Sequence, residues 1–260
     1  MLSVVMPALN EEGCIAATLA EVTSALSRER IPYELIVVDD GSTDGTRNCV
    51  EQAHLSDPGI HLVENLGQHG FGMAVRAGVQ HATGDAVVVM MADASDSPSD
   101  LVRYYRVFEE HRCCVFGSRF IHGGKVIEYP AHKLVINRVA NWFVKVLFGL
   151  RYNDVTNAFK CYTREAIEHI QPLISRHFNL TVEMPLKVIV RGFSYTVVPI
   201  TWTNRKSGVS KLKLKEMGSR YLFIVLYLWL EKYLTHGDYK KREVQHAAGN
   251  ELTPKAIDDL

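Results

Sequence analysis

Short apolar runs alternate with stretches of helical periodicity through the first half of the chain. The apolar runs predict strands at residues 3–6, 34–38, 60–63, 86–90 and 113–116. A helix capped by Asn10 is predicted after the first strand, and further helices are predicted at residues 43–53, 71–81 and 101–110. Strands separated by helices of this length favour an α/β fold, with a mostly parallel sheet flanked by helices.

The second half is less regular, although a strand is predicted at residues 195–202 and two long helices stand out. One helix is predicted at residues 132–148, with Val135, Val139, Trp142 and Val146 on one face. The other, at residues 214–234, is apolar and follows a basic stretch, so it can lie at an anionic lipid surface, although such a helix also often packs on its own domain or on a dimer partner. Its longest uncharged run is about half of the ~20 residues that span a bilayer, so any membrane role is expected to be peripheral.

Composition gives limited information about partners and compartment. The chain has 29 Lys and Arg against 29 Asp and Glu, and it has no groove-reading motif, so nucleic acid is not expected as a partner. The five cysteines are odd in number and lack paired metal spacing, which favours buried, reduced thiols. Because no signal peptide is recognised either, a cytoplasmic protein is predicted.

Carboxylates and small residues follow three of the predicted strands, in loops at residues 7–11, 39–42 and 93–96. Loops at the carboxyl ends of parallel strands open on one crevice, so we expect the three to form a single site. Asp39 and Asp40 can accept hydrogen bonds from a ribose or a base. A plain Asp/Gly turn followed by a helix cap explains the same residues equally well.

The third loop carries a candidate metal site. Asp93 and Asp96 offer the oxygen ligands that Mg²⁺ or Mn²⁺ prefers, and such an ion would bridge the phosphates of a sugar nucleotide. The alternative is that Asp96 caps the turn before Pro98 and that only Asp93 is functional. Basic residues of later loops are candidate anion binders: Arg119, Arg205 and Lys211.

A set of longer motifs extends over roughly residues 1–215. Its members lie at residues 5–12, 37–46, 69–72, 82–85, 117–120, 154–160, 183–184, 198–200 and 205–212. In order and spacing the set resembles the family 2 glycosyltransferases with the GT-A fold. It is most similar to the dolichol-phosphate mannose synthase branch, which transfers a sugar onto a polyprenyl phosphate.

The resemblance implies an inverting glycosyltransferase that moves a sugar from a nucleotide-sugar donor to a polyprenyl phosphate at the cytoplasmic face of a membrane. The chain would then divide into a GT-A domain at residues 1–212, an interfacial amphipathic helix at 213–236 and a disordered polar tail at 237–260. Other expected partners are the membrane surface, a second copy of the chain or a membrane partner subunit.

The resemblance also implies roles for individual residues. The donor would contact Pro7, Leu9, Glu11, Asp39, Asp40, Gly70, Ala92, Asp93, Arg205 and Lys211. The acceptor phosphate would contact Arg119, Lys133, Asn137 and Arg138. The metal would be Mg²⁺ or Mn²⁺ on Asp93, Ser95 and Asp96, and the catalytic residues would be Asp93, Asp96, Arg119 and Arg205. Glu183 matches a family acid for which we expect a structural role.

One departure from the family pattern affects the metal site. Met91 stands where this branch usually has the first Asp of an Asp-x-Asp motif, so the metal would depend on Asp93, with Ser95 and Asp96 as further ligands. Two alternatives remain open. One is an enzyme of the same fold with a glycan or another non-lipid acceptor. The other is a catalytically silent, nucleotide-sugar-binding scaffold subunit, in which Met91 marks the loss of metal binding.

Overall fold

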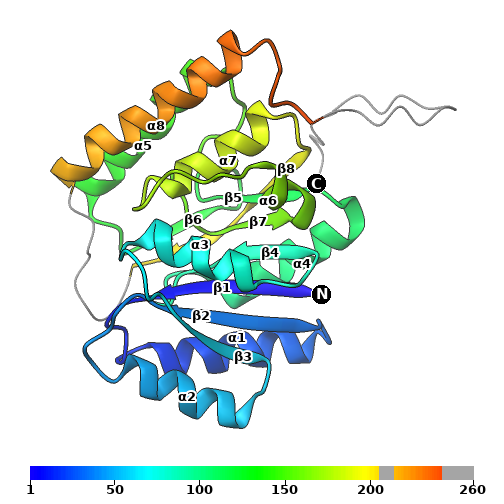
Figure 1. Cartoon of the computed structure of the whole chain (residues 1–260), viewed down its shortest axis with the longest axis vertical. Helices are drawn as coiled ribbons and strands as arrows, with labels where there is room; N and C mark the ends of the chain where they lie inside the picture. Colours follow the sequence, from blue (N-terminus) through cyan, green and yellow to red (C-terminus); the bar gives the residue numbers. More distant parts are fainter. Residues whose placement is uncertain (205–213, 242–260) are drawn as a thin grey trace, which may run out of the picture.

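A seven-stranded sheet with helices on both faces forms the body of the protein (Figure 1). The structure is a computed structural model and describes residues 1–204 and 214–241. The strand order is β3-β2-β1-β4-β7-β5-β8, and a separate parallel pair is formed by β6 and β9. The strands are β1 Leu2–Ala8, β2 Tyr33–Asp39, β3 Ile60–Glu64, β4 Ala86–Val89, β5 Cys114–Ser118, β6 Lys125–Ile127, β7 Lys160–Thr163, β8 Tyr195–Pro199 and β9 Thr201–Thr203.

The helices form two layers, one against each face of the sheet. One layer contains α1 Ile15–Arg28, α2 Thr46–Ser56 and α4 Pro98–His111. The other contains α3 Phe71–His81, α5 Ala131–Phe148, α6 Arg164–His169, α7 Leu180–Val190 and α8 Leu214–Leu234. Side chains alternate along each strand, so Val5 of β1 packs under the second layer while Val4 and Met6 pack under the first. Both faces are therefore apolar, as a buried parallel sheet requires.

The predicted α/β fold with a mostly parallel sheet is confirmed. The exception is β7, which lies antiparallel between β4 and β5 and was not predicted. Because its direction is reversed, its first residue, Lys160, pairs with Val89 and Phe116 near the carboxyl ends of β4 and β5. The segment that leads into β7 therefore reaches the same edge of the sheet as the three carboxylate loops.

Two local predictions are wrong. Asn10 does not cap a helix, because α1 begins only at Ile15, after Cys14. Instead, Asn10 joins the first two loops, with its side-chain oxygen accepting the Thr43 N–H at 2.8 Å. The strand predicted at residues 195–202 is two strands, β8 and β9, which belong to different sheets.

The helix predicted at residues 214–234 is present as α8, and it packs on α7. Ile224, Val225 and Leu228 contribute to the core beneath it. A buried ion pair joins the two helices, with Arg191 Nε 2.9 Å from an oxygen of Glu231. The division of the chain into a catalytic domain, an interfacial helix and a disordered tail remains a prediction.

Candidate active site

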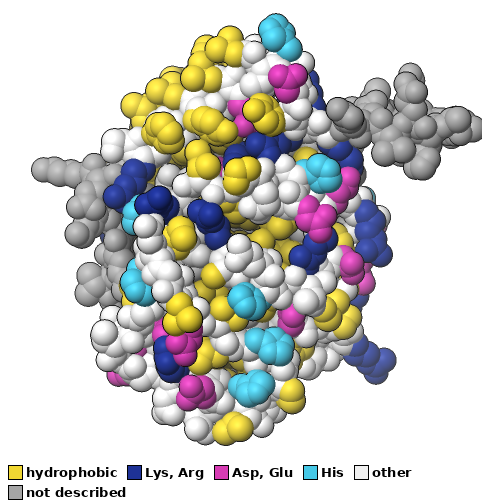
Figure 2. Space-filling view, viewed as in Figure 1, with side chains coloured by type: hydrophobic (Ala, Val, Ile, Leu, Met, Phe, Trp, Pro, Cys, Tyr) yellow, Lys and Arg dark blue, Asp and Glu magenta, His cyan; other side chains and the backbone are white. Residues whose placement is uncertain are grey.

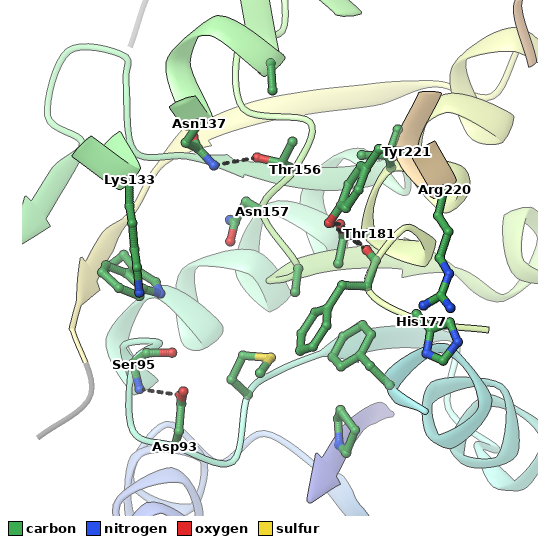
Figure 3. Close-up of a pocket in the computed structure, with 18 of the residues that line it drawn as sticks. Asp93, Ser95, Lys133, Asn137, Thr156, Asn157, His177, Thr181, Arg220 and Tyr221 are labelled. Carbon is green, nitrogen blue, oxygen red and sulfur yellow. Dashed lines mark hydrogen bonds between the residues drawn. The ribbon is translucent and has the colours of Figure 1, made fainter. Parts of the chain in front are cut away.

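The three carboxylate loops meet at one cavity of about 800 Å³, as predicted. Pro7, Leu9 and Glu11 line it from the end of β1, Asp40 from the end of β2, and Asp93 from the loop after β4. Further walls come from the segment before β7 and from the amino-terminal halves of α5 and α8. Figure 3 shows the resulting arrangement, with Asp93 and Ser95 at the bottom and side chains of α5 and α8 above. The base thus carries the carboxylates, and the two helices add mostly apolar positions together with Lys133, Asn137 and Arg220.

Asp40 is held in the cavity wall by hydrogen bonds from two neighbouring segments. Its carboxylate accepts hydrogen bonds from the Asn65 side chain at 2.7 Å and from the Gly70 backbone N–H at 2.8 Å. Gly70 has a φ of 144°, a region open to glycine alone, and a Cβ there would lie 2.6 Å from the Arg176 carbonyl. The glycine thus lets the backbone before α3 approach both Asp40 and the cavity closely.

Two predicted donor contacts do not reach the cavity wall. Asp39 is buried behind the loop, where its carboxylate accepts the Ser42 N–H at 3.0 Å and pairs with Arg47 at 3.3 Å. Ala92 is turned into the core, and its carbonyl accepts the Thr18 hydroxyl at 3.2 Å. These two residues support the loops from behind, and their roles as ligand contacts remain predictions.

The acidic loop brings Asp93, Ser95 and Asp96 together on the cavity wall beside Met91. Asp93 accepts the Ser95 N–H at 3.1 Å, and the residue between them, Ala94, has a φ of 59°. Asp96 accepts the Met91 N–H at 2.9 Å. Burial, together with the nearby negative charge of Asp93, raises the pKa of Asp96 to about 7. Two carboxylates are therefore held close together on the cavity wall.

The residues of this loop fit a divalent cation, although fewer protein ligands are present than the family pattern supplies. Two carboxylates and a hydroxyl are hard oxygen donors of the kind that Mg²⁺ and Mn²⁺ bind. In the described part of the chain, no cluster of three or more His, Cys, Asp or Glu side chains could hold a metal by itself. Substrate oxygens would have to complete the coordination shell.

Arg119 lies on the cavity wall, and Asp154 already takes two of its five guanidinium N–H donors. Arg119 donates three hydrogen bonds to the Asp154 carboxylate, from Nε at 2.8 Å, from Nη2 at 2.7 Å and from the backbone N–H at 2.9 Å. Burial disfavours the charged form of Arg119, yet the attraction of Asp154 raises its pKa above the ordinary value. Lys160 is buried nearby, and burial lowers its pKa to about 7. Arg119 therefore offers a fixed positive charge and its remaining guanidinium donors.

The predicted acceptor residues on α5 divide into two groups. Lys133 and Asn137 line the cavity, and Lys133 reaches down toward Ser95 and Asp93 (Figure 3). Asn137 donates to the Thr156 hydroxyl at 2.9 Å, which ties α5 to the segment before β7. Arg138 does not line the cavity, and its contact with the acceptor remains a prediction. Its guanidinium stacks on the Phe120 ring, 4.3 Å from the centroid.

Sequence reasoning missed the wall of the cavity opposite Lys133. His177 and Thr181 approach it from the start of α7, and Arg220 and Tyr221 approach it from α8 (Figure 3). The Tyr221 hydroxyl donates to the Phe178 carbonyl at 3.0 Å. No motif marks these residues, and only the packing of α8 on α7 brings them to the site.

Three further predictions have different outcomes. Glu183 is structural, as expected, because it accepts the Ile174 and Ser175 N–H groups at 2.8 and 2.7 Å. It also pairs with Lys187 at 2.7 Å. Arg205 and Lys211 lie outside the described residues, so their roles remain predictions.

Comparison with known proteins identifies the family. The profile named Glycosyl transferase family 2 matches residues 3–171. A polyprenol monophosphomannose synthase of Mycolicibacterium smegmatis is 33% identical over 215 residues, which cover 80% of each chain. This chain belongs to glycosyl transferase family 2. An undecaprenyl-phosphate mannosyltransferase of Micrococcus luteus, a further relative, is 27% identical over 213 residues, covering 80% of this chain and 86% of the relative.

Solved structures confirm the predicted GT-A fold of this family 2 glycosyltransferase. Glucosyl-3-phosphoglycerate synthase from Mycobacterium tuberculosis with bound uridine diphosphate superposes with a TM-score of 0.66 at 18% identity, covering 88% of this chain and 80% of that one. The same synthase with Mn²⁺, uridine diphosphate and phosphoglyceric acid also gives a TM-score of 0.66 at 18% identity, over 88% and 78% of the two chains. Within the described residues, no helix is both long enough and apolar enough to cross a membrane.

Proposed function

We propose that this protein is an inverting glycosyltransferase that moves a hexosyl group from a nucleotide sugar to a polyprenyl phosphate. The proposal is carried by one observation: the cavity described above joins a base of carboxylate loops to a region lined by apolar positions. Its base is formed by the carboxylate loops, which suit a nucleoside diphosphate, and it continues upward between apolar positions of α5 and α8. A soluble glycan acceptor would not require apolar walls. The two named relatives are both enzymes of polyprenyl-linked mannose, in agreement with a lipid phosphate acceptor.

The nucleoside would bind along Pro7, Leu9 and Glu11, with Asp40 at the inner end. Donor specificity would come from hydrogen bonds to this rigid edge, because the Asp40 carboxylate is already held by Asn65 and Gly70. The diphosphate would then lie over Asp93 and Ser95, on the side of the cavity below Lys133. This order follows the geometry of the sheet edge from β2 through β1 to β4.

Transfer would require little proton chemistry from the protein. An oxygen of the acceptor phosphate attacks the anomeric carbon, and the bond from that carbon to the donor phosphate oxygen breaks on the opposite face, so the configuration inverts. The nucleophile is already an anion, so positioning and charge neutralisation can carry the step. Lys133 and Arg119 are the described cations on the wall that would hold the acceptor phosphate. Arg205 and Lys211 are proposed to neutralise the donor phosphates.

A divalent cation, Mg²⁺ or Mn²⁺, is proposed to bind at Asp93 with help from Ser95 and Asp96. When bound, it would neutralise charge on the departing nucleoside diphosphate. Structures of glucosyl-3-phosphoglycerate synthase that share this fold contain Mn²⁺ or Mg²⁺. We further propose that the protein acts peripherally at the cytoplasmic face of a membrane, since a lipid acceptor must be reached from an aqueous donor pool.

The test is transfer of labelled sugar from nucleotide sugars to a polyprenyl phosphate in the presence of Mg²⁺ or Mn²⁺. We expect an organic-soluble labelled product that depends on the acceptor and on the metal and is lost in EDTA. Donor binding without transfer to any polyprenyl phosphate would contradict the proposal and favour a scaffold subunit. Transfer to a soluble glycan in place of the lipid would favour a different acceptor on the same fold.

A further inference from the structure

An apolar surface covers the two helices above the cavity, where a soluble domain would normally expose polar residues. The face of α5 predicted as apolar is turned outward, and Val135, Val139, Trp142 and Val146 are all exposed. Trp142 alone retains 64% of its surface in solvent. The inner face of α5 instead carries Asn141, which holds the Thr156 backbone and side chain. An amphipathic helix normally buries its apolar stripe, but nothing in residues 1–204 or 218–241 covers this one.

α8 extends the same surface. Ile224 and Leu228 pack into the core, while Phe223, Leu226 and Leu230 are exposed. Figure 2 shows apolar side chains gathered over α5 and α8 at the top of the molecule. We call this exposed set the α5–α8 face, defined by Val135, Val139, Trp142 and Val146 of α5 and by Phe223, Leu226 and Leu230 of α8.

The two helices run in the same direction, and their amino-terminal ends flank the cavity. Lys232, near the end of α8, donates to the Phe148 carbonyl at the end of α5, at 2.7 Å. At the other end, Ile136 of α5 and Leu222 of α8 both line the cavity and are both about half exposed. The α5–α8 face is therefore continuous with the cavity wall through Ile136 and Leu222.

Charge distinguishes among possible occupants. Over Ala131–Phe148 and residues 218–234, the only carboxylate is Glu231, which is buried against Arg191. The same stretches carry Lys and Arg at Lys133, Arg138, Lys145, Arg220 and Lys232. An apolar face that has cations and no exposed acids complements an anionic lipid surface. Exposed Trp and Tyr side chains at such a face suit the boundary between headgroups and acyl chains. A second copy of the same face would oppose cations to cations.

We propose that the α5–α8 face docks on an anionic bilayer and that the acceptor's isoprenoid chain enters the cavity between the amino-terminal halves of α5 and α8. This inference rests on the proposed function for its acceptor, but the docking itself can be measured without any transfer. Docked in this way, Lys133 would stand between the bilayer and Asp93, so the acceptor phosphate would need to move only a short way from the membrane surface.

The experiment uses a Val139→Glu/Trp142→Glu variant of the full chain, because neither side chain lines the cavity. Leu55→Glu on α2 is the matched control, since Leu55 is also an exposed apolar residue, with 76% of its surface in solvent, but lies on a different helix layer. Flotation would be measured with vesicles of phosphatidylcholine alone and with added phosphatidylglycerol. Transfer would be measured with a long-chain polyprenyl phosphate in the same vesicles and with a short, water-soluble one.

We expect wild type and Leu55→Glu to float with the anionic vesicles. The double variant should bind them at least tenfold more weakly, since the repulsion between each added carboxylate and the anionic surface should lower the binding constant about fivefold. It should also transfer at least tenfold more slowly to the vesicle acceptor, while its rate with the soluble acceptor stays within about twofold of wild type.

Unchanged flotation of the double variant would overturn the proposal, as would equal losses with both acceptors. If the wild type forms a dimer and does not bind vesicles, and the double variant is monomeric, the proposal is overturned and the face is assigned to a second copy of the chain. Vesicle binding without transfer to either acceptor would uphold the docking and reject the proposed function.

Discussion

The buried pair Arg119–Asp154 offers a test of how charge is held beneath the site. Asp154 is fully buried and accepts three hydrogen bonds from Arg119, so Asp154→Asn leaves a buried guanidinium without its counter-ion. Breaking such a pair from one side costs about 3–5 kcal/mol. The cost should lie at the upper end, because Asp154 is also the group that favours the charged form of the buried Lys160. Arg119→Met should be milder, since Asp154 then still faces Lys160.

The decisive variant combines both changes. Arg119→Met/Asp154→Asn removes the stranded guanidinium, so it should recover about 1–2 kcal/mol of the free energy of unfolding relative to Asp154→Asn alone. Urea unfolding followed by tryptophan fluorescence measures this. Arg106→Met, which breaks an exposed pair with Glu109, is the control and should cost no more than about 1 kcal/mol. If the double variant loses as much free energy of unfolding as the two single variants lose together, the pair is not coupled and the electrostatic reasoning is wrong. Every variant without Arg119 should still lose transfer, because its stability and its role toward the acceptor are separate.

Three further outcomes are expected. Asp93→Ala should reduce metal-dependent transfer at least 100-fold in a protein that remains folded, whereas Glu110→Ala, at an exposed acid of α4, should leave transfer unchanged; equal activity of the two variants refutes the role of Asp93. Because burial raises the pKa of Asp96 from an ordinary ~3.9 to about 7, its ionisation destabilises the fold as pH rises through that window. In EDTA, the stability advantage of Asp96→Asn over wild type should therefore grow by about 2 kcal/mol from pH 5 to pH 8, and a constant difference would contradict the assigned cause. Gly72→Ala should destabilise by about 1–3 kcal/mol, since the new Cβ would lie 2.5 Å from the Ser175 carbonyl; a gain of about 1 kcal/mol from helix propensity alone would show that the contact relaxes freely.

The base of the site could be predicted from the sequence because it follows from strand direction. Parallel strands place their carboxyl ends together, so acids after β1, β2 and β4 had to converge, and they do. The same reasoning could not separate Asp40, which lines the cavity, from Asp39, which supports the loop behind it. Adjacent residues point to opposite sides, and a shift of one residue in the turn would exchange their roles. Sequence reasoning also could not find β7, because a strand of four residues is too short to show a pattern, and a sequence pattern does not indicate the direction of a strand.

The upper half of the site shows a different limit of sequence reasoning. The periodicity of α5 correctly predicts a helix with one apolar face, but periodicity does not say what covers that face. Asn137 and Asn141 occupy the inner side because they hold the segment before β7 through Thr156, which forces the apolar stripe outward. The polar contacts that build the acceptor wall therefore also create the exposed surface. If the proposed docking holds, a single helix orientation would satisfy both requirements of the proposed transfer: polar contacts that fix the loop beside the cavity, and an apolar face toward the bilayer that supplies the acceptor.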